Sequence, residues 1–194
     1  MKLEEIANVV AGQIMTRVTD INTDGETVQV LVPKAVVDGI IVKADLGEAV
    51  LSKAVDESKY TKEGDVVVKL STPYDAAYVT SEDAGLVIPS FCAAIRIKKQ
   101  DLMDAKYLSA FLNTSYVRNQ LAAKVVGSAR PMIKISDIRA LELPKVPMQD
   151  MNDIGEAYIL SGKKKTTLLE MVVTESKLME NIVLASIKEG MKND

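Results

Sequence analysis

The chain has 194 residues, enough for one or two domains, and 47% of them are hydrophobic, enough for a buried core. It has no histidine and one cysteine, Cys92, which excludes ordinary zinc sites, internal disulfides and catalytic sets that pair serine or cysteine with histidine. We see neither a signal peptide nor an apolar run long enough for a membrane span, so we expect a cytoplasmic protein without membrane contact.

The net charge of −3 is unevenly distributed along the chain. Residues 1–95 carry a net charge of −7, residues 96–145 one of +6, and residues 146–194 one of −2. A basic middle in an acidic chain indicates one face for a polyanion such as DNA. Solvated helical faces would account for the charge count equally well.

The first half of the chain predicts one short helix followed by strands. We expect the helix at residues 2–11, where apolar residues recur at helical spacing. Short β-rich segments separated by turn signals predict strands at residues 27–32, 35–43 (interrupted at Asp38–Gly39), 66–70, 76–79, 86–88 and 91–97. Residues 48–55 fit neither pattern. Together these strands indicate a small twisted sheet.

Helical periodicity begins after the last strand. Asp104 is expected to cap a helix that ends near Leu112, and Ser115 to cap the next. Ser136 or Asp137 would cap a third, short helix. The sequence therefore predicts an α+β fold, with flanking helices on a small sheet.

Residues 149–188 contain no proline and carry a heptad-like apolar seam with several polar members. At 1.5 Å per residue such a helix would be about 60 Å long, too long to bury its stripe on a domain of this size. It predicts a coiled-coil partner, either a second copy or another protein. The alternative is two shorter helices, broken at Ser161–Gly162. We expect a domain at residues 1–147 and a spacer or dimerisation helix at 148–190.

Motifs that would indicate catalysis are missing or weak. No phosphate-binding glycine loop occurs. Thr72–Pro73–Tyr74 faintly resembles a methyltransferase motif, but it lacks the residues that precede that motif, so we interpret it as a turn. The Glu142 to Lys145 segment resembles a nuclease site without its partner acid, and we interpret it as structural. Cys92 follows an aromatic residue in a predicted strand, which favours a buried core position.

One stretch carries a family resemblance. Gly127-Ser128-Ala129-Arg130-Pro131, a short helix around Ile138, and a proline-flanked exit through Pro144 and Pro147 resemble the specificity subunits of type I restriction–modification systems. The Asp104…Tyr107-Leu108…Phe111-Leu112 helix is similar to a helix of the same family. Family members typically have two target-recognition domains and two spacer helices, whereas this chain has length for one of each.

The resemblance implies a non-catalytic DNA-recognition subunit. Its target-recognition domain would read one half-site of double-stranded DNA, and its helix would pair antiparallel with that of a second copy, making a homodimer. It would bind a methyltransferase subunit that flips and methylates adenine, and in some systems a motor–nuclease subunit. The chain itself would hold no cofactor, because S-adenosylmethionine belongs to the methyltransferase.

We expect DNA contacts from side chains that can reach phosphates or base edges. In falling order, the candidates are Arg130, Ser128, Lys134, Thr72, Tyr74, Lys69, Arg17, Gln13, Arg118 and Lys124. Two other functions fit the sequence: a stand-alone regulator or decoy that binds DNA or the methyltransferase, and a coiled-coil adaptor with no DNA role.

Overall fold

A computed structural model describes residues 1–20, 25–125 and 132–190, with side chains through residue 188. The chain divides into two compact units, Met1–Ile159 and Leu160–Asp194. Short 3-10 helices connect many of the elements: η1 (Leu3–Glu5), η2 (Met15–Arg17), η3 (Pro33–Ala35), η4 (Lys43–Asp45), η5 (Glu57–Lys59) and η6 (Ser81–Asp83).

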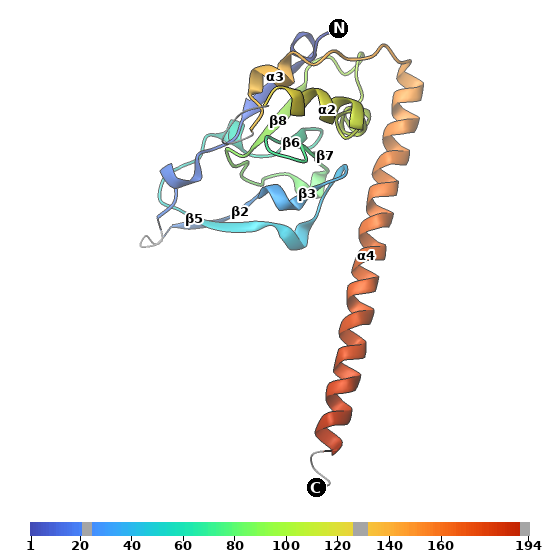
Figure 1. The fold of residues 1–194 in the computed structure, drawn as a ribbon. Helices are drawn as coiled ribbons and strands as arrows, with labels where there is room; N and C mark the ends of the chain where they lie inside the picture. The colour runs from blue at the N-terminus through green and yellow to red at the C-terminus, as the bar shows by residue number, and fades with distance from the viewer. Residues whose placement is uncertain (21–24, 126–131, 191–194) are drawn as a thin grey trace. The chain divides into compact units, whose positions relative to one another are not determined.

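The first unit is built on an antiparallel four-stranded sheet in the order β1-β8-β6-β7 (Figure 1). Its strands are β1 (Ala7–Ala11), β8 (Cys92–Ile97), β6 (Val66–Lys69) and β7 (Ala76–Tyr78). The strands predicted at 66–70, 76–79 and 91–97 are thereby confirmed.

The helix predicted at residues 2–11 is wrong. Only Leu3–Glu5 are helical, as η1, and the following five residues form β1. Alternate residues of this strand, Ala7 and Val9, are buried while Asn8 is exposed, and the strand pairs along its whole length with β8. A partner strand nearly ninety positions away therefore overrode an apolar spacing that fitted a helix equally well.

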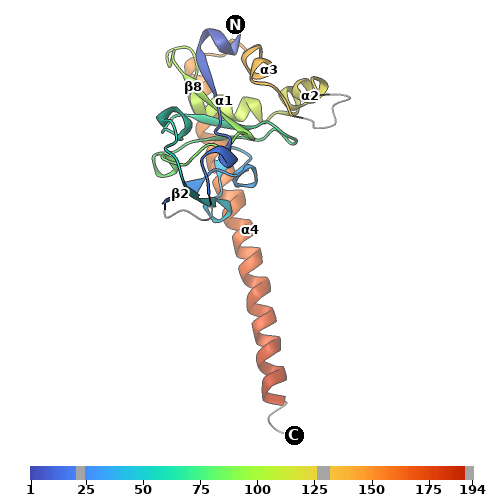
Figure 2. The same ribbon diagram turned by 90° about the vertical axis from the view of Figure 1, so that its left-hand side faces the viewer.

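Both faces of the sheet are covered. On one face lie α1 (Ala105–Leu112), α2 (Ser115–Ala123) and α3 (Ile135–Arg139), whose buried side chains share a core with Val66, Val68 and Ile95. The other face contacts the segments around Leu31, Val36 and Ile88. Figure 2 shows the three helices in the upper part of the unit and β2 in the lower part. Such two-sided burial accounts for the nearly continuous apolar sequence of β6 and β8.

Two further antiparallel pairs complete the described β-structure: β2 (Glu26–Val30) with β5 (Gly47–Leu51), and β3 (Val36–Val37) with β4 (Ile40–Ile41). Asp38 and Gly39 form the β3–β4 turn with φ of 38° and 95°, as a tight hairpin requires. The strand predicted at 86–88 is wrong: Val87 makes only isolated bridges, to Val30 and Tyr60, and joins no continuous ladder.

The helix starts follow local capping chemistry. The Asp104 carboxylate accepts a hydrogen bond from the Tyr107 backbone N at 2.7 Å, which confirms the predicted cap of α1. The cap of α2 is Thr114 rather than Ser115, and its hydroxyl accepts from Val117 N at 3.3 Å. Ser136 and Asp137, the predicted caps of α3, lie inside the helix. Lys134 occupies the N-cap position, and its backbone N donates to the Asp137 carboxylate at 2.8 Å.

Both edges of the four-stranded sheet are closed by hydrogen bonds. On β1, the carbonyl of Val9 accepts from Arg139 at 3.2 Å, and that of Ala11 accepts from Lys59 at 2.8 Å. On β7, the backbone of Gly39 exchanges two hydrogen bonds with the strand, at 2.9 and 3.0 Å. Edges without such partners are templates for association with another chain.

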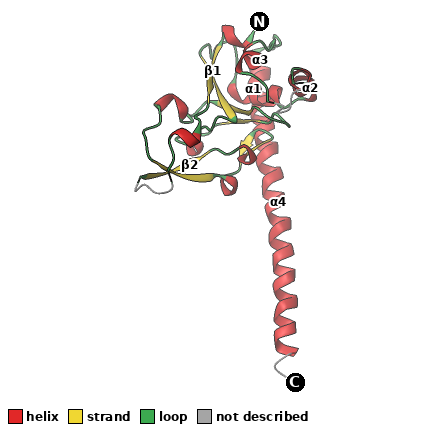
Figure 3. Cartoon of the chain, turned by 60° about the vertical axis from the view of Figure 1, so that its left-hand side comes forward, coloured by secondary structure: helices red, strands yellow, loops and turns green. Residues whose placement is uncertain are grey.

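Helix α4 (Met148–Gly190) is continuous, which favours the long-helix prediction over two helices broken at Ser161–Gly162 (Figure 3). Up to Ile159 it belongs to the first unit, where Met151 and Ile159 are buried. In the second unit its large apolar side chains, such as Leu168 and Ile182, are about half exposed. Among the described residues, no helix is long and apolar enough to cross a membrane.

Candidate nucleic-acid interface

Four strand ends meet at one end of the four-stranded sheet. The antiparallel registers place Ala11 opposite Ala93, Lys69 opposite Cys92, and Val68 opposite Ala76. The carboxyl ends of β1 and β6 therefore lie beside the amino ends of β8 and β7. The segments that leave these strands are residues 12–17, 70–75 and 89–91, and they are joined there by residues 132–134. We refer to these four segments as the loop end.

Backbone hydrogen bonds fix the loop end as one structure. Gln13 donates to Ile88 O, and Ser90 donates to Gln13 O, both at 2.7 Å. Leu70 donates to Phe91 O at 2.9 Å, and Ile133 donates to Leu70 O at 2.8 Å. Four segments that are separated in sequence are thereby held on one support, as a preorganised binding surface requires.

Gly12 permits the close approach of residues 12–17 to residues 89–91. A Cβ at this position would lie 2.0 Å from the carbonyl oxygen of Pro89, so only glycine fits without a backbone shift. Glycine is therefore required at position 12 by this close contact and not by a positive φ.

Several residues predicted to contact DNA gather at the loop end. Arg17, Thr72 and Lys134 are exposed there, and Gln13 is half-buried with its amide donating to Ile14 O at 3.1 Å. Lys124 is exposed at the C-cap of α2. Ser128 and Arg130, which carried most of the sequence argument, lie outside the described residues.

Of the other predicted contacts, Tyr74 and Lys69 are buried, and Arg118 is partly buried. Tyr74 is only 3% exposed and belongs to the helix-side core, with φ of 61°. The Lys69 ammonium pairs with the Asp75 carboxylate at 2.8 Å, and both side chains are about one-tenth exposed. Arg118 binds the other oxygen of Asp75 at 2.5 Å. These three side chains therefore support the loop end from beneath.

Arg118 extends the buried ion pair into a larger charge cluster. Its guanidinium also donates to Asp38 at 3.2 Å and to the Asn113 side-chain oxygen at 2.8 Å. Asn113 in turn accepts from the backbone N of Ala76 at 3.0 Å. We call Lys69, Asp75, Arg118, Asp38 and Asn113 the charge cluster. It links the β6–β7 turn, the β3–β4 turn and the junction of α1 with α2.

Tyr158 of α4 packs against this cluster. A Cβ on Gly39 would lie 2.5 Å from a ring carbon of Tyr158, so the ring fits only against a glycine. Burial raises the pKa of Tyr158 to about 12, and the nearby Asp38 carboxylate acts in the same direction. The first turns of α4 are thus attached to the same charged groups that support the β6–β7 turn.

Part of the positive charge of residues 96–145 is used inside the fold. Arg96 binds the buried Asp65 carboxylate at 3.1 Å, and Lys106 pairs with Glu156. Burial raises the pKa of Asp65 in spite of the Arg96 guanidinium. The charge count along the sequence therefore overstated the cationic surface, whereas Lys124 and Lys134 remain exposed.

Sequence reasoning missed two apolar side chains at the loop end. Phe91 is 54% exposed and Ile14 is 39% exposed, and they directly follow the hydrogen-bonded Ser90 and Gln13 in the chain. A signal was present, because Phe91 is one of only two phenylalanines and follows a turn-forming Pro-Ser pair. The sequence predicts Phe91 as the first residue of a strand, but the strand begins one residue later, at Cys92.

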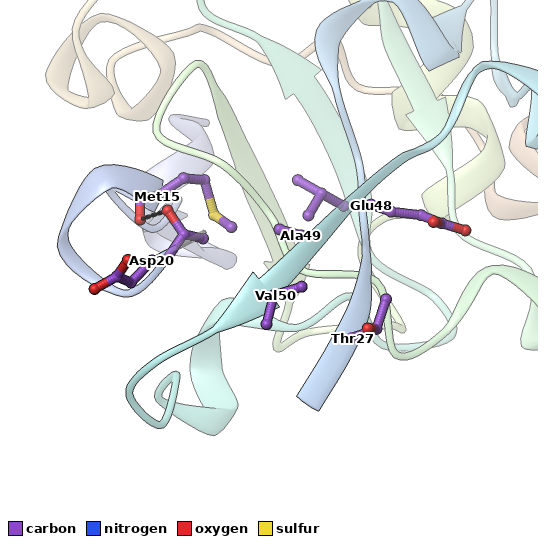
Figure 4. Close-up of a pocket in the computed structure, with 8 residues that line it drawn as sticks. Met15, Asp20, Thr27, Glu48, Ala49 and Val50 are labelled. Carbon is purple, nitrogen blue, oxygen red and sulfur yellow. Dashed lines mark hydrogen bonds between the residues drawn. The ribbon is translucent and has the colours of Figure 1, made fainter. Parts of the chain in front are cut away.

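A surface pocket of about 720 Å³ lies between η2 and the β2–β5 pair. Figure 4 shows Met15 and Asp20 on one side of it and Ala49 and Val50 of β5 on the other, with the Met15 sulfur directed toward the strands. Its charged lining residues are Asp20 and Glu48, which do not suit a phosphate backbone.

Two other chemistries find no support in the part of the chain that the structure describes. No group of three potential ligand residues there could hold a metal ion. Burial raises the pKa of the Cys92 thiol to about 12, so this cysteine is an unreactive core residue, as its sequence position predicted.

The comparisons find similar solved structures but no matching family model or curated protein sequence. The crystal structure of the HsdS subunit from Thermoanaerobacter tengcongensis matches with a TM-score of 0.63 and 18% identity, covering 92% of this chain and 46% of that one. A chain from a structure on complex assembly and conformational transition of the type I R-M system matches with the same TM-score and identity, covering 96% and 48%.

The likeness shows the fold: the chain has the α+β fold of HsdS, the specificity subunit of type I restriction–modification systems, with its long helix. The resemblance noted in the sequence is thereby confirmed at the level of fold. The chain spans about half the length of the solved structures it matches.

Proposed function

We propose that this chain is a non-catalytic DNA-recognition subunit of a type I restriction–modification system. Each copy reads one half-site and directs an adenine methyltransferase subunit, which carries the S-adenosylmethionine. The assembly works in the cytoplasm. The observation that carries the proposal is the gathering, on an HsdS fold, of predicted DNA contacts from distant segments at one sheet end.

The loop end is the proposed DNA surface. Arg17 and Lys134 supply cations for phosphates, while Thr72 and Gln13 present hydroxyl and amide groups that suit base edges. Lys69, Tyr74 and Arg118 are proposed to position the β6–β7 turn, because they are buried or paired. Ser128 and Arg130 stay predictions from the sequence.

The second unit is the proposed assembly element. Its apolar side chains are about half exposed along the helix, including Leu168, Met171, Leu178 and Ile182. An exposed stripe of this length is energetically costly unless another helix covers it. Antiparallel pairing with a second copy would place two recognition units on an inverted repeat, since a two-fold dimer reads a two-fold site.

Affinity purification from the native host tests the proposal first. The tagged chain is expected to co-purify with an adenine methyltransferase. The complex is then expected to bind duplex DNA with an affinity that falls steeply with salt. Recovery of neither partner would refute the specificity-subunit function. DNA binding without any methyltransferase would indicate a stand-alone regulator, and a protein partner without DNA binding would indicate an adaptor.

The DNA surface is tested by paired lysine variants. Lys134→Ala at the loop end is expected to weaken binding to every duplex and to lower the salt dependence by about one phosphate contact. Lys99→Ala removes an equally exposed lysine beyond the opposite end of β8 and serves as the control. Equal binding by both variants would place the DNA surface elsewhere.

A further inference from the structure

The most unusual side chain of the loop end is the exposed ring of Phe91. With 54% of its surface exposed, it leaves apolar area in water that a binding partner could cover. Ile14, the neighbour of Gln13, is also exposed, at 39%.

The backbone under Phe91 is fixed. Its carbonyl accepts from Leu70 N at 2.9 Å, and the next residue, the fully buried Cys92, donates to Pro89 O at 2.9 Å. The preceding Ser90 donates to Gln13 O. The exposed ring therefore stands on the rigid end of the sheet, which keeps its presentation constant.

The surroundings of Phe91 favour a polyanion as the molecule that covers it. Leu70 is hydrogen-bonded to both Phe91 and Ile133, and the exposed Lys134 directly follows Ile133 in the chain. Arg17 is exposed at the end of η2, a few residues after Gln13. An apolar ring on the same loop end as exposed cations is complementary to DNA, because the cations can contact phosphates and the ring can contact bases.

We propose that Phe91 is an apolar wedge that enters a base step of the bound duplex and unstacks it. This inference rests on the proposed function, and it adds a residue and a mode of reading to it. Wedges of this kind partly unstack a step and kink the duplex. Because base steps differ in how easily they deform, Phe91 would contribute sequence preference without a hydrogen bond to any base.

The test uses the full chain, with its methyltransferase where that is needed for binding, and a duplex enriched from a random-sequence pool by the wild-type protein. 2-Aminopurine is placed at successive positions of this duplex to report unstacking, and end-attached dyes report bending. Apart from the adenine that the methyltransferase flips, wild-type protein is expected to brighten 2-aminopurine at one further step and to bend the duplex. Phe91→Ala is expected to abolish both signals and to weaken binding about tenfold, in the range of lost base–aromatic contacts.

Control variants separate wedge insertion from general effects. Phe91→Leu keeps an apolar wedge and is expected to retain most of the bend. Leu102→Ala removes a side chain that is 40% exposed beyond the opposite end of β8, and is expected to change nothing. Circular dichroism of Phe91→Ala is expected to match wild type, because the ring lies outside the described core clusters.

Each outcome decides the proposal. Unstacking and bending that persist in Phe91→Ala would overturn the wedge while leaving the DNA-recognition function intact. Loss of methyltransferase binding with DNA distortion unchanged would overturn it in favour of a protein contact. If the wild-type protein enriches no duplex, the proposed function itself fails, and the wedge fails with it.

Discussion

Asp75 is the residue on which the charge cluster depends. Its carboxylate receives both Lys69 and Arg118, and its side chain is 9% exposed. Asp75→Asn would leave the buried Lys69 ammonium without a counter-ion and Arg118 with Asp38 alone, so we expect a loss of about 3 kcal/mol in the free energy of unfolding. Urea unfolding followed by circular dichroism measures it.

The control is Lys34→Ala, which breaks an ion pair whose side chains are 67% and 41% exposed. Exposed pairs contribute about 0–1 kcal/mol, so its unfolding midpoint should stay near that of wild type. If both variants lose the same small amount, the charge cluster contributes no more than a surface pair.

The raised pKa of Tyr158 predicts that the stability of the fold depends on pH. Its pKa rises from 10 to about 12 on folding, so between these values the unfolded chain releases the phenol proton while the folded chain keeps it. The folded form then binds more protons, and stability that is present below pH 10 is lost as the pH rises toward 12.

Tyr158→Phe should therefore lose less stability than wild type between pH 10 and 12, as measured by urea unfolding at each pH. Tyr116→Phe, whose ring is 65% exposed, is the matched control and should follow wild type. Parallel pH profiles for wild type and Tyr158→Phe would contradict the packing of the phenol against the charge cluster.

The residue-level predictions from sequence succeeded where the chemistry was local. Asp104 caps α1 because an Asp three residues before a backbone N needs no distant partner. The ion pairs of Lys69 and Arg118, two predicted DNA contacts, depend on Asp75 and Asp38, whose proximity follows only from the fold. The sequence predicts a strand that starts at Phe91, and periodicity does not reveal that this residue lies just beyond the sheet end.

At the scale of elements, α4 contacts the start of α1 through Gly155. A Cβ there would lie 2.7 Å from both the Asp104 carboxylate and the backbone N of Tyr107. Gly155→Ala gains about 1 kcal/mol of helix propensity, but we expect a net loss of about 1–2 kcal/mol because backbone atoms must move.

Thermal unfolding compares this variant with Ser161→Ala, an exposed change on the same helix that should be neutral or slightly stabilising. A gain in stability for Gly155→Ala would mean that α4 does not approach α1 as closely as the structure places it.

Elements were predictable from sequence where a single apolar face at helical spacing defined them. The seam of α4 and the amphipathic face of α1 repeat at helical spacing, and both helices were predicted correctly. The failures at residues 2–11 and 86–88 share a cause. In each, the backbone partner lies far away in sequence, so spacing alone did not distinguish a strand, a bridge and a helix.

At the scale of the whole molecule, assembly is the property most open to test. Leu168→Glu combined with Ile182→Glu places charges on the exposed apolar stripe of the second unit, where both side chains are about half exposed. We expect sedimentation equilibrium to show the mass of two chains for wild type and of one chain for the variant. Lys177→Glu, on the polar side of the helix, should leave the dimer intact. A wild-type monomer would refute self-pairing.

The loop end also bears on how such a protein could change over generations. The cores on both faces of the sheet are built from strand and helix side chains, whereas Thr72, Phe91 and Lys134 are exposed. Substitutions at these three positions therefore carry little thermodynamic penalty. Under the proposed function, single exchanges at these positions would alter the DNA sequence that the surface prefers, while the scaffold stays constant.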